Sequence, residues 1–388
     1  MKRGSTGRYE ISISAGEQIK AFIPAPLPPE IPVEMDKGRQ QRLERATLAL
    51  GRLDSITLLL PDPNLFLYTY VRREAVLSSQ IEGTQSSLAD FMLFELDQAP
   101  GVPLDDVVEV SNYVAAMDHG LARLKEGFPL SNRLIREMHA ILLSRGRGSE
   151  KEPGEFRRSQ NWIGGTRPGS AHFVPPPPQH VQECMLQLEE FLHDKQNPYS
   201  SIIKAALVHV QFETIHPFLD GNGRIGRLLI AFVLHHDRVI TQPILYLSLF
   251  FKQHRTEYYR LLDLVRTNGD WEAWVDFFLD GVEHTATNAV ESARRLVALI
   301  QQDEIRIQLL GRITATALRV FRVLCERPLI TLKEVCGRSA LTFPAAAKGI
   351  RALEQLGMVR EITGRRRDRV FMYDQYMKIL SEGTEPLR

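Results

Sequence analysis

The chain has 388 residues, of which 44% are hydrophobic and 24% are charged, as in an ordinary soluble protein of two or three domains. Its net charge of +1 neither favours nor excludes a polyanionic partner, so charge has to be considered region by region. Three widely spaced cysteines, an N-terminus without an apolar leader, and apolar stretches too short for a membrane span predict a cytoplasmic protein without a disulfide framework or a membrane partner.

The first 40 residues are rich in proline and polar side chains, which predicts an extended arm over the surface or a disordered segment. Apolar residues at helical spacing follow, and Pro61 and Pro63 interrupt them. The helical segments expected before residue 150 are 39–99, 107–125 and 130–144, with a polar break at 100–106.

Residues 153–178 interrupt this helical pattern. Turn-forming residues at Gly164-Gly165 and Pro168-Gly169 lie between two apolar stretches, which predicts a short β-hairpin over 161–174. Four prolines at 175–178 end the hairpin, and helices are expected again from Val181 to about Leu310.

The segment 312–388 is basic, with 15 lysines and arginines against eight aspartates and glutamates, a net charge of +7. Its pattern predicts three helices, a strand, a basic turn and a second strand, which is the element order of a winged helix-turn-helix domain. Arg365, Arg366 and Arg367 at the hairpin tip would suit DNA phosphates, but Ala345–Ala347 offers no group that reads bases. A DNA-binding role and a protein-docking or homodimer role both remain open.

The most informative stretch is HPFLDGNGRIGR, residues 216–227. The segments 202–215 and 228–234 on either side are strongly apolar, so the polar loop between them is expected at the mouth of a buried core. Pro217 prevents the first helix from continuing, and Asp220 is expected near the start of the second.

The second helix would begin with a phosphate-binding site. Small residues let backbone N–H groups approach an anion at a helix N-terminus, and two arginines three positions apart on one helical face suit a polyphosphate. The expected nucleotide-binding residues are Gly221, Asn222, Gly223, Arg224, Ile225, Gly226 and Arg227.

Asp220 and His216 complete the predicted chemistry. A carboxylate would repel a phosphate unless a cation lies between them, so Asp220 implies Mg²⁺ or Mn²⁺. His216 precedes the phosphate site, and an ordinary histidine pKa near neutrality suits a general base that takes the proton of an attacking hydroxyl.

The complete stretch resembles the signature of Fic-domain proteins. Members that keep every position transfer AMP from ATP to a Ser, Thr or Tyr hydroxyl of a target protein, so the resemblance implies ATP as substrate, His216 as base, Asp220 as metal ligand, and Arg227 at the terminal phosphate. The family's flap hairpin resembles residues 156–175, where the target protein would add as a strand. A lid that touches no target is the alternative for this segment.

The resemblance also suggests where the nucleoside would bind. Gln253 lies about where related proteins contact it, and Tyr258 or Tyr259 could stack on adenine, unless both tyrosines belong to the core.

A second motif precedes the catalytic stretch. Ser78 and Glu82, in SSQIEG, are four positions apart and share one face of a helix. The pattern resembles the inhibitory helix of one Fic class, which implies that Glu82 pairs with Arg227 and keeps it from the γ-phosphate. An ordinary solvated carboxylate is the alternative.

The expected fold is therefore mainly α-helical, with these parts: 1–106, arm and inhibitory helical region; 107–265, Fic core; 266–311, connecting helices; 312–388, winged helix. Two other functions remain open. One is a transcriptional regulator whose Fic core only senses nucleotide, and the other is transfer of UMP, phosphocholine or phosphate. The last usually goes with a lysine at the position of Gly223, which this chain lacks.

Overall fold

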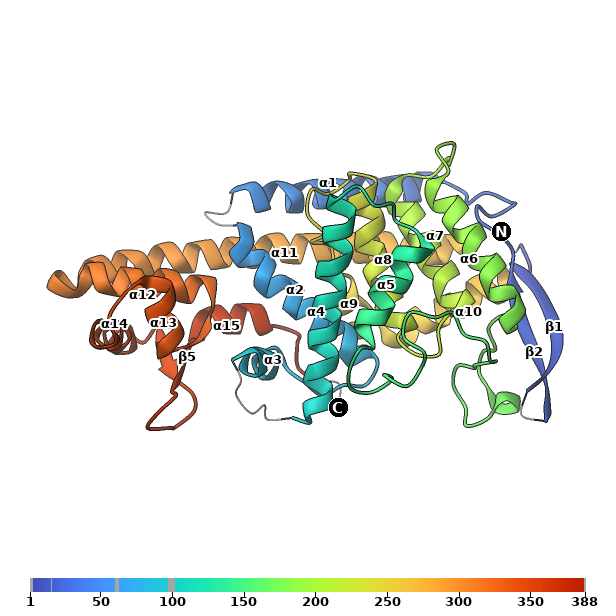
Figure 1. The fold of residues 1–388 in the computed structure, drawn as a ribbon. Helices are drawn as coiled ribbons and strands as arrows, with labels where there is room; N and C mark the ends of the chain where they lie inside the picture. The colour runs from blue at the N-terminus through green and yellow to red at the C-terminus, as the bar shows by residue number, and fades with distance from the viewer. Residues whose placement is uncertain (1–2, 15, 60–62, 97–101, 387–388) are drawn as a thin grey trace. The chain divides into compact units, whose positions relative to one another are not determined.

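The computed structural model describes residues 3–14, 16–59, 63–96 and 102–386, which form a mainly helical protein (Figure 1). The helices are α1 (Lys37–Leu59), α2 (Pro63–Ile81), α3 (Leu88–Glu95), α4 (Leu104–Lys125), α5 (Asn132–Leu142), α6 (Pro178–His193), α7 (Ser201–Ile215), α8 (Asn222–His236), α9 (Ser248–Gln253), α10 (Arg255–Asn268), α11 (Trp271–Gln308), α12 (Thr314–Glu326), α13 (Leu332–Ser339), α14 (Phe343–Gln355) and α15 (Asp374–Ser381). The strands are β1 (Gly7–Ser14), β2 (Glu17–Pro24), β3 (Leu329–Thr331), β4 (Val359–Glu361) and β5 (Val370–Tyr373). None of the helices in these ranges is long and apolar enough to cross a membrane.

The chain divides into two compact units, and each is discontinuous in sequence. The first unit comprises Met1–Asp54, Leu77–Gly83 and Val108–Thr287, and the second comprises Ser55–Val76, Thr84–Val107 and Asn288–Arg388. The helical segments expected from periodicity are confirmed. Pro63 begins α2, whereas Pro61, Ala99 and the start of the expected break at 100–106 lie outside the described residues.

The N-terminal arm differs from its prediction, because it forms a regular antiparallel hairpin. β1 pairs with β2 from Gly7↔Pro24 to Ser14↔Glu17. Ile19, Ala21 and Ile23 alternate along β2 and are all buried, so the strand period gives the hairpin an apolar face. The prolines that favoured an extended arm come only after this hairpin.

The core of the first unit surrounds two apolar helices. Almost every residue of α7 and of α8 is buried, and the two helices lie side by side, with α5, α6 and α10 packed around them (Figure 1). A helix that is apolar on all faces belongs in a protein interior. The polar loop between α7 and α8 is thus held at the end of the most deeply buried pair of helices.

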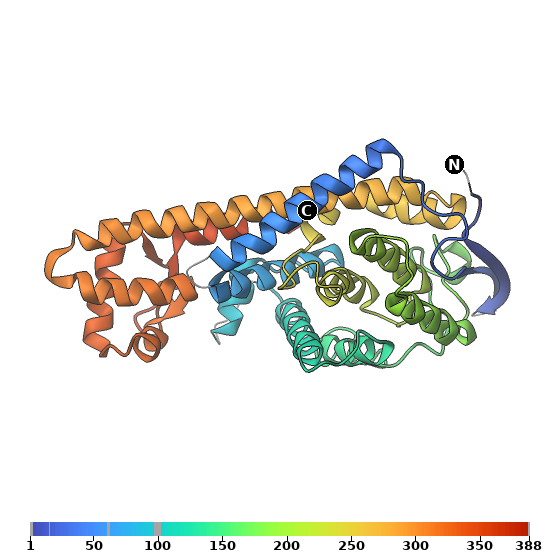
Figure 2. The ribbon, with the colours of Figure 1, turned by 90° about the horizontal axis from the view of Figure 1, so that it is seen from above.

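The flap segment, residues 156–175, is less regular than the predicted hairpin. Its only described strand pairing is one bridge between Ile163 and Phe173, and a 3-10 turn at Pro168–Ser170 replaces the rest of the ladder. Consecutive turn residues, including a proline that cannot donate a hydrogen bond, explain the missing pairs. The N-terminal hairpin lies beside this segment, because the Phe22 N–H donates to the Val174 carbonyl at 2.9 Å (Figure 2).

The second unit ends in a small mixed module with the element order that the sequence predicts, plus two elements that it missed. The sheet order is β3-β5-β4, all antiparallel, and α12, α13 and α14 pack against one another. The missed elements are the short strand β3 and the final helix α15, both of which contact β5.

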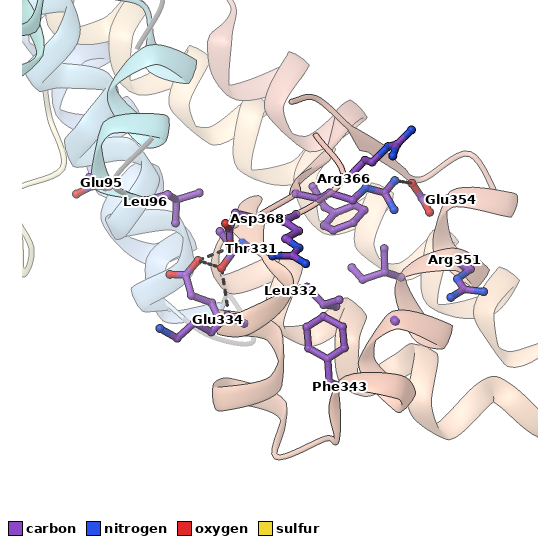
Figure 3. A pocket seen from close by; sticks show the side chains of 16 residues that line it. Glu95, Leu96, Thr331, Leu332, Glu334, Phe343, Arg351, Glu354, Arg366 and Asp368 are labelled. Atoms are coloured by element: carbon purple, nitrogen blue, oxygen red, sulfur yellow. Dashed lines mark hydrogen bonds and ion pairs between the residues drawn. The ribbon is translucent and has the colours of Figure 1, made fainter. Parts of the chain in front are cut away.

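A cleft of about 960 Å³ opens in this module between α13, α14 and the turn before β5. Arg351, Arg366 and the apolar ring of Phe343, which is 62% exposed, all line this cleft (Figure 3). Glu334, which also lines the cleft, belongs to the capping box of α13, since it accepts from the Thr331 N–H at 3.1 Å. The cleft therefore combines basic and apolar side chains.

Candidate active site

The site is built on the loop that ends α7 and begins α8. His216 adopts a left-handed backbone conformation with φ of +48°, and its N–H donates to the Phe212 carbonyl at 2.9 Å, so it caps α7. Pro217 follows and ends the helix, as predicted. A left-handed conformation is uncommon for a residue other than glycine and persists where its surroundings hold it.

Side-chain amides hold the middle of the loop. The Asn222 side chain accepts from the Phe218 N–H at 2.9 Å and donates to the Phe218 carbonyl at 2.8 Å. Asn161, from the flap segment, donates to the same carbonyl at 3.0 Å. The Asn222 side chain thus fixes the loop that presents the N-terminus of α8, and the predicted contact of its backbone with phosphate stays a prediction.

The N-terminus of α8 faces the site. The helix begins at Asn222, two residues later than predicted, after Gly221 with φ of +75°. Its first N–H groups have no carbonyl one turn earlier to bind, so they are available to an anion. At Gly223 a Cβ would lie 2.2 Å from Glu82 Oε1, so a larger residue there would displace the Glu82 carboxylate.

Two of the predicted nucleotide-binding positions point into the protein instead. The Ile225 side chain is fully buried, and its N–H donates to the Gly221 carbonyl at 3.1 Å within the helix. A Cβ at Gly226 would lie 2.3 Å from Glu213 Oε1 of α7, so this glycine lets the two helices approach closely. The side-chain positions of Ile225 and Gly226 thus serve the packing of α8 in the core, and the predicted contact of these two residues with nucleotide stays a prediction.

The predicted pair of Glu82 and Arg227 is present. Arg227 Nη2 donates to Glu82 Oε1 at 2.7 Å, and Arg227 Nε donates to the Ser78 hydroxyl at 2.8 Å. The Arg227 side chain is 2% exposed and that of Glu82 is 32% exposed. Burial opposes ionisation of Glu82, but the neighbouring Arg227 outweighs it and holds the pKa of Glu82 below its ordinary value.

The segment that carries Glu82 is held by further contacts within the first unit. Lys252 Nζ donates to the Gln80 side chain at 2.7 Å, and the Arg255 guanidinium donates to the Ile81 carbonyl at 3.4 Å. These contacts come from α9 and α10, the region where the nucleoside was expected.

Arg224 is paired with a residue that the sequence did not reveal. Its guanidinium, 1% exposed, donates to Glu109 Oε2 at 3.0 Å and to Asp220 Oδ1 at 3.3 Å. Glu109 lies on α4 and also pairs with Arg147 at 3.0 Å. Only its position in the fold distinguishes Glu109 from the other glutamates, so no sequence signal could have identified it.

His139 supports the same loop from α5. It accepts from the Gly154 N–H at 2.8 Å through Nδ1, so its Nε2 donates to the Asp220 carbonyl at 3.0 Å. Its ring stacks on Phe218, with 3.7 Å between the ring centres. Burial lowers the pKa of His139 to about 4, so it stays neutral and holds the loop as a fixed donor.

Asp220 suits a metal ion that takes most of its ligands from water and phosphate. Its Oδ1 accepts from the Gly221 N–H and from Arg224, whereas Oδ2 has no hydrogen bond in the described part of the chain. The side chain is 35% exposed. Within the described ranges no three histidine, cysteine or acidic side chains cluster as a metal site.

His216 has the protonation state of a base. Burial lowers its pKa to about 3, and the nearby cations Arg157 and Arg266 add to this effect. Its imidazole is therefore neutral near pH 7. Its buried Nδ1 has no hydrogen-bond partner among the described residues, so it can accept a proton.

The three residues predicted near the nucleoside are placed differently. Gln253 ends α9 and is exposed, and Tyr259 is 39% exposed with the Arg255 guanidinium 5.7 Å from its ring centre. Tyr258 is 1% exposed, and its hydroxyl bonds to His209 at 2.9 Å. Tyr258 thus belongs to the core, the alternative that the sequence left open, because adjacent residues of a helix point in directions about 100° apart.

The loop thus brings a neutral histidine next to a helix N-terminus that is flanked by arginines. Residues 40–122 match the Fic/DOC family N-terminal domain, and residues 129–234 match the Fic/DOC family domain. The chain belongs to the Fic/DOC family.

The chain is also similar in sequence to proteins that have names. A protein from Aedes aegypti named "Protein adenylyltransferase Fic" is 33% identical over 261 residues, 66% of this chain and 48% of the relative. A protein of the same name from Culex quinquefasciatus is 31% identical over 278 residues, 70% of this chain and 52% of the relative. The chain thus spans about half the length of these relatives.

Solved structures share the fold. A Fic family protein from Desulfovibrio desulfuricans G20 superposes with a TM-score of 0.58 at 18% identity. The superposition covers 88% of this chain and 97% of that one.

Proposed function

We propose that the chain is a protein adenylyltransferase, which moves AMP from ATP onto a Ser, Thr or Tyr hydroxyl of a target protein and releases pyrophosphate. The observation that carries this proposal is the neutral His216 beside the open N-terminus of α8, with Arg227 at the same site. The shared name of the relatives described above supports it.

Each residue of the site has its own role in the proposed reaction. His216 takes the proton of the acceptor hydroxyl as the new O–P bond to the α-phosphorus forms and the bond to pyrophosphate breaks. The N–H groups that open α8 bind phosphate oxygens, and Arg224 and Arg227 compensate their charge. Loop contacts from Asn222 and His139 keep this arrangement fixed before substrate arrives.

The position of the label in ATP distinguishes transfer of AMP from the alternative functions. Protein incubated with ATP labelled at the α-phosphate should incorporate label, whereas label at the γ-phosphate should not be incorporated. A regulator that only senses nucleotide would take up neither label. A kinase would incorporate the γ-label, and transfer of UMP or phosphocholine would require UTP or CDP-choline in place of ATP.

We propose that Asp220 holds Mg²⁺ or Mn²⁺, which would neutralise phosphate charge and assist departure of pyrophosphate. Asp220→Asn is expected to bring transfer down to background, because it removes the carboxylate charge and keeps the backbone carbonyl that His139 binds. The measurement is labelling at increasing Mg²⁺ concentrations, with chelator as the reference. Labelling that is as fast in excess chelator would contradict the role of Asp220.

The flap segment is the proposed binding place for the target. An extended target strand would add to its edge near Ile163, whose N–H and carbonyl already bond to residues 172 and 173. Glu82 is the proposed brake on the site, because it occupies the Arg227 guanidinium that the terminal phosphate needs. We further propose a cytoplasmic location, consistent with three cysteines that form no disulfide.

We propose that residues 312–388 form a winged helix-turn-helix domain, which binds DNA or docks a protein such as a second copy. The element order and the β3-β5-β4 sheet support the domain type. The exposed side chains of Arg366 and Arg367 support the DNA role, and the exposed ring of Phe343 supports docking.

Binding to a labelled DNA duplex across salt concentrations separates the two roles of this module. If the module binds DNA, the double variant Arg366→Ala/Arg367→Ala should bind the duplex more weakly. The slope of log affinity against log salt should fall by about 2. Arg360→Ala is the matched control, since it removes a charge that is paired with Asp374. If no duplex binds at low salt, the docking role stands, and sedimentation should detect a dimer.

A further inference from the structure

Arg157 is a buried arginine that neither the motif nor the proposed chemistry uses. It is 2% exposed, and in the described part of the chain it forms no ion pair. Its guanidinium instead donates only to backbone carbonyls: those of His216 at 2.9 Å, Pro176 at 2.5 Å, Ser159 at 3.3 Å and Ile215 at 3.4 Å. A buried charge without a counter-ion is costly, so its carbonyl partners have to be held in place around it.

These carbonyls belong to two parts of the site that are far apart in sequence. Ser159 and Pro176 are at the start and just after the end of the flap segment, whereas Ile215 and His216 end α7. The backbone of Arg157 adds a further link, since its N–H donates to the Pro217 carbonyl at 2.9 Å. One residue therefore joins both ends of the flap segment to the catalytic loop.

The bond to the His216 carbonyl has a specific consequence. His216 has an unfavourable left-handed backbone, and that conformation decides which way its imidazole projects. Arg157 Nε holds the carbonyl of this same residue, and two other donors of the guanidinium hold the flap. The distance between the imidazole and a strand bound on the flap is thus set through one rigid, planar group.

We propose that Arg157 is a positioning residue, which fixes the His216 imidazole relative to the flap segment so that an acceptor hydroxyl on a bound target strand meets the base. This inference rests on the proposed function, because it takes His216 as the base and the flap as the target site. It assigns to Arg157 no contact with ATP, so the affinity for nucleotide should not depend on it.

The charge of Arg157 also acts on the imidazole. The ionisable groups that act on His216 are Arg157 from the flap segment, Arg266 from α10 and Glu82 after α2, and its ring also bonds to the backbone at Glu213 on α7. The two cations lower the pKa of His216, and Glu82 raises it. A neutral residue in place of Arg157 should therefore raise that pKa, whereas lysine should maintain it.

Two substitutions separate position from charge, and both are made in the full chain carrying Glu82→Gly. Arg157→Met removes the charge and the donors, and Arg157→Lys keeps the charge but loses the planar fork. We expect self-labelling from α-labelled ATP to be slower by about a hundredfold with methionine and by about tenfold with lysine. The affinity for ATP should stay within about twofold of the parent. Arg133→Met is the matched control, because Arg133 is 73% exposed.

NMR titration of the His216 imidazole provides a readout that does not require turnover. Arg157→Met should raise the pKa of His216 by about one, and Arg157→Lys should leave it near the parent value. A purely structural role would lower the melting temperature and the ATP affinity of both variants, which would overturn the proposal. Labelling of Arg157→Met as fast as that of Arg133→Met would also overturn it. If the proposed function is wrong, the parent and Arg133→Met will take up no label either. That outcome differs from failure of the present proposal, in which both of these proteins are labelled.

Discussion

His216→Ala is expected to abolish transfer of labelled AMP while ATP still binds. The neutral imidazole would act on the attacking hydroxyl, so its loss raises the barrier of the chemical step without removing any contact to phosphate. Loss of a positioned base typically slows a reaction by about 10²- to 10⁴-fold. The measurement pairs the labelling rate with ATP affinity from calorimetry, in the Glu82→Gly background.

The control for this variant is another histidine on the next helix. His236 is exposed at the end of α8 that is opposite to the site, so His236→Ala removes an imidazole without touching the site and should label at the rate of the parent. Labelling by His216→Ala at the rate of the parent would remove His216 from the mechanism. Loss of ATP affinity together with activity would instead indicate that His216 holds the loop, since it caps α7.

The catalytic loop could be predicted from sequence because its chemistry and its local structure lie in one short stretch. Pro217 ends a helix, glycines expose N–H groups, and arginines follow at helical spacing, so neighbours in sequence are neighbours in the site. The pair of Glu82 and Arg227 was also predicted, although the two residues are far apart in the chain. Each belongs to a recognisable motif, and the family resemblance implies that the two motifs are in contact.

The groups that support the loop could not be predicted. Glu109, His139 and Arg157 act through buried contacts with residues far away in sequence, and nothing in their own neighbourhood marks them. Ile225 and Gly226 are within the motif, but α8 turns their side-chain positions into the core, and the motif alone does not indicate which face of the helix each residue occupies.

The N-terminal hairpin and the irregular flap show how local composition misled the prediction at the strand level. The prolines of residues 25–32 led to the prediction of an extended or disordered arm for the first 40 residues, although Ile19, Ala21 and Ile23 have the spacing of a strand just before them. In the flap the same turn residues that suggested a hairpin are so numerous that only one bridge remains, between Ile163 and Phe173.

Glu82→Gly is expected to raise transfer and self-modification strongly. In the structure the Glu82 carboxylate occupies the Arg227 guanidinium and lies over the N-terminus of α8, where a Cβ on Gly223 would be 2.2 Å from it. ATP needs both places for its phosphates. Each 1.4 kcal/mol of bias removed from the occupied state corresponds to about tenfold more competent enzyme. Rates of α-label incorporation at saturating ATP and Mg²⁺ provide the measurement.

Glu82→Gln separates charge from bulk, and a double variant tests the partner. Glutamine keeps the size of the side chain but removes the charge that pairs with Arg227, so its rate should lie between those of the parent and Glu82→Gly. Glu82→Gly with Arg227→Ala should be slow again, because the freed guanidinium is missing. If Glu82→Gly is no faster than the parent, Glu82 is an ordinary carboxylate and the brake is misidentified.

Stability supplies an independent readout of the same pair. Arg227 is 2% exposed, and without Glu82 its charge is left without its only close carboxylate partner among the described residues. The unliganded variant should therefore melt at a lower temperature than the parent, because a buried charge without its partner is costly. ATP would restore the missing negative charge, so the rise in melting temperature on adding ATP should be larger for Glu82→Gly than for the parent. An equal rise in both proteins would mean that the phosphates of ATP do not take the place of Glu82 at Arg227.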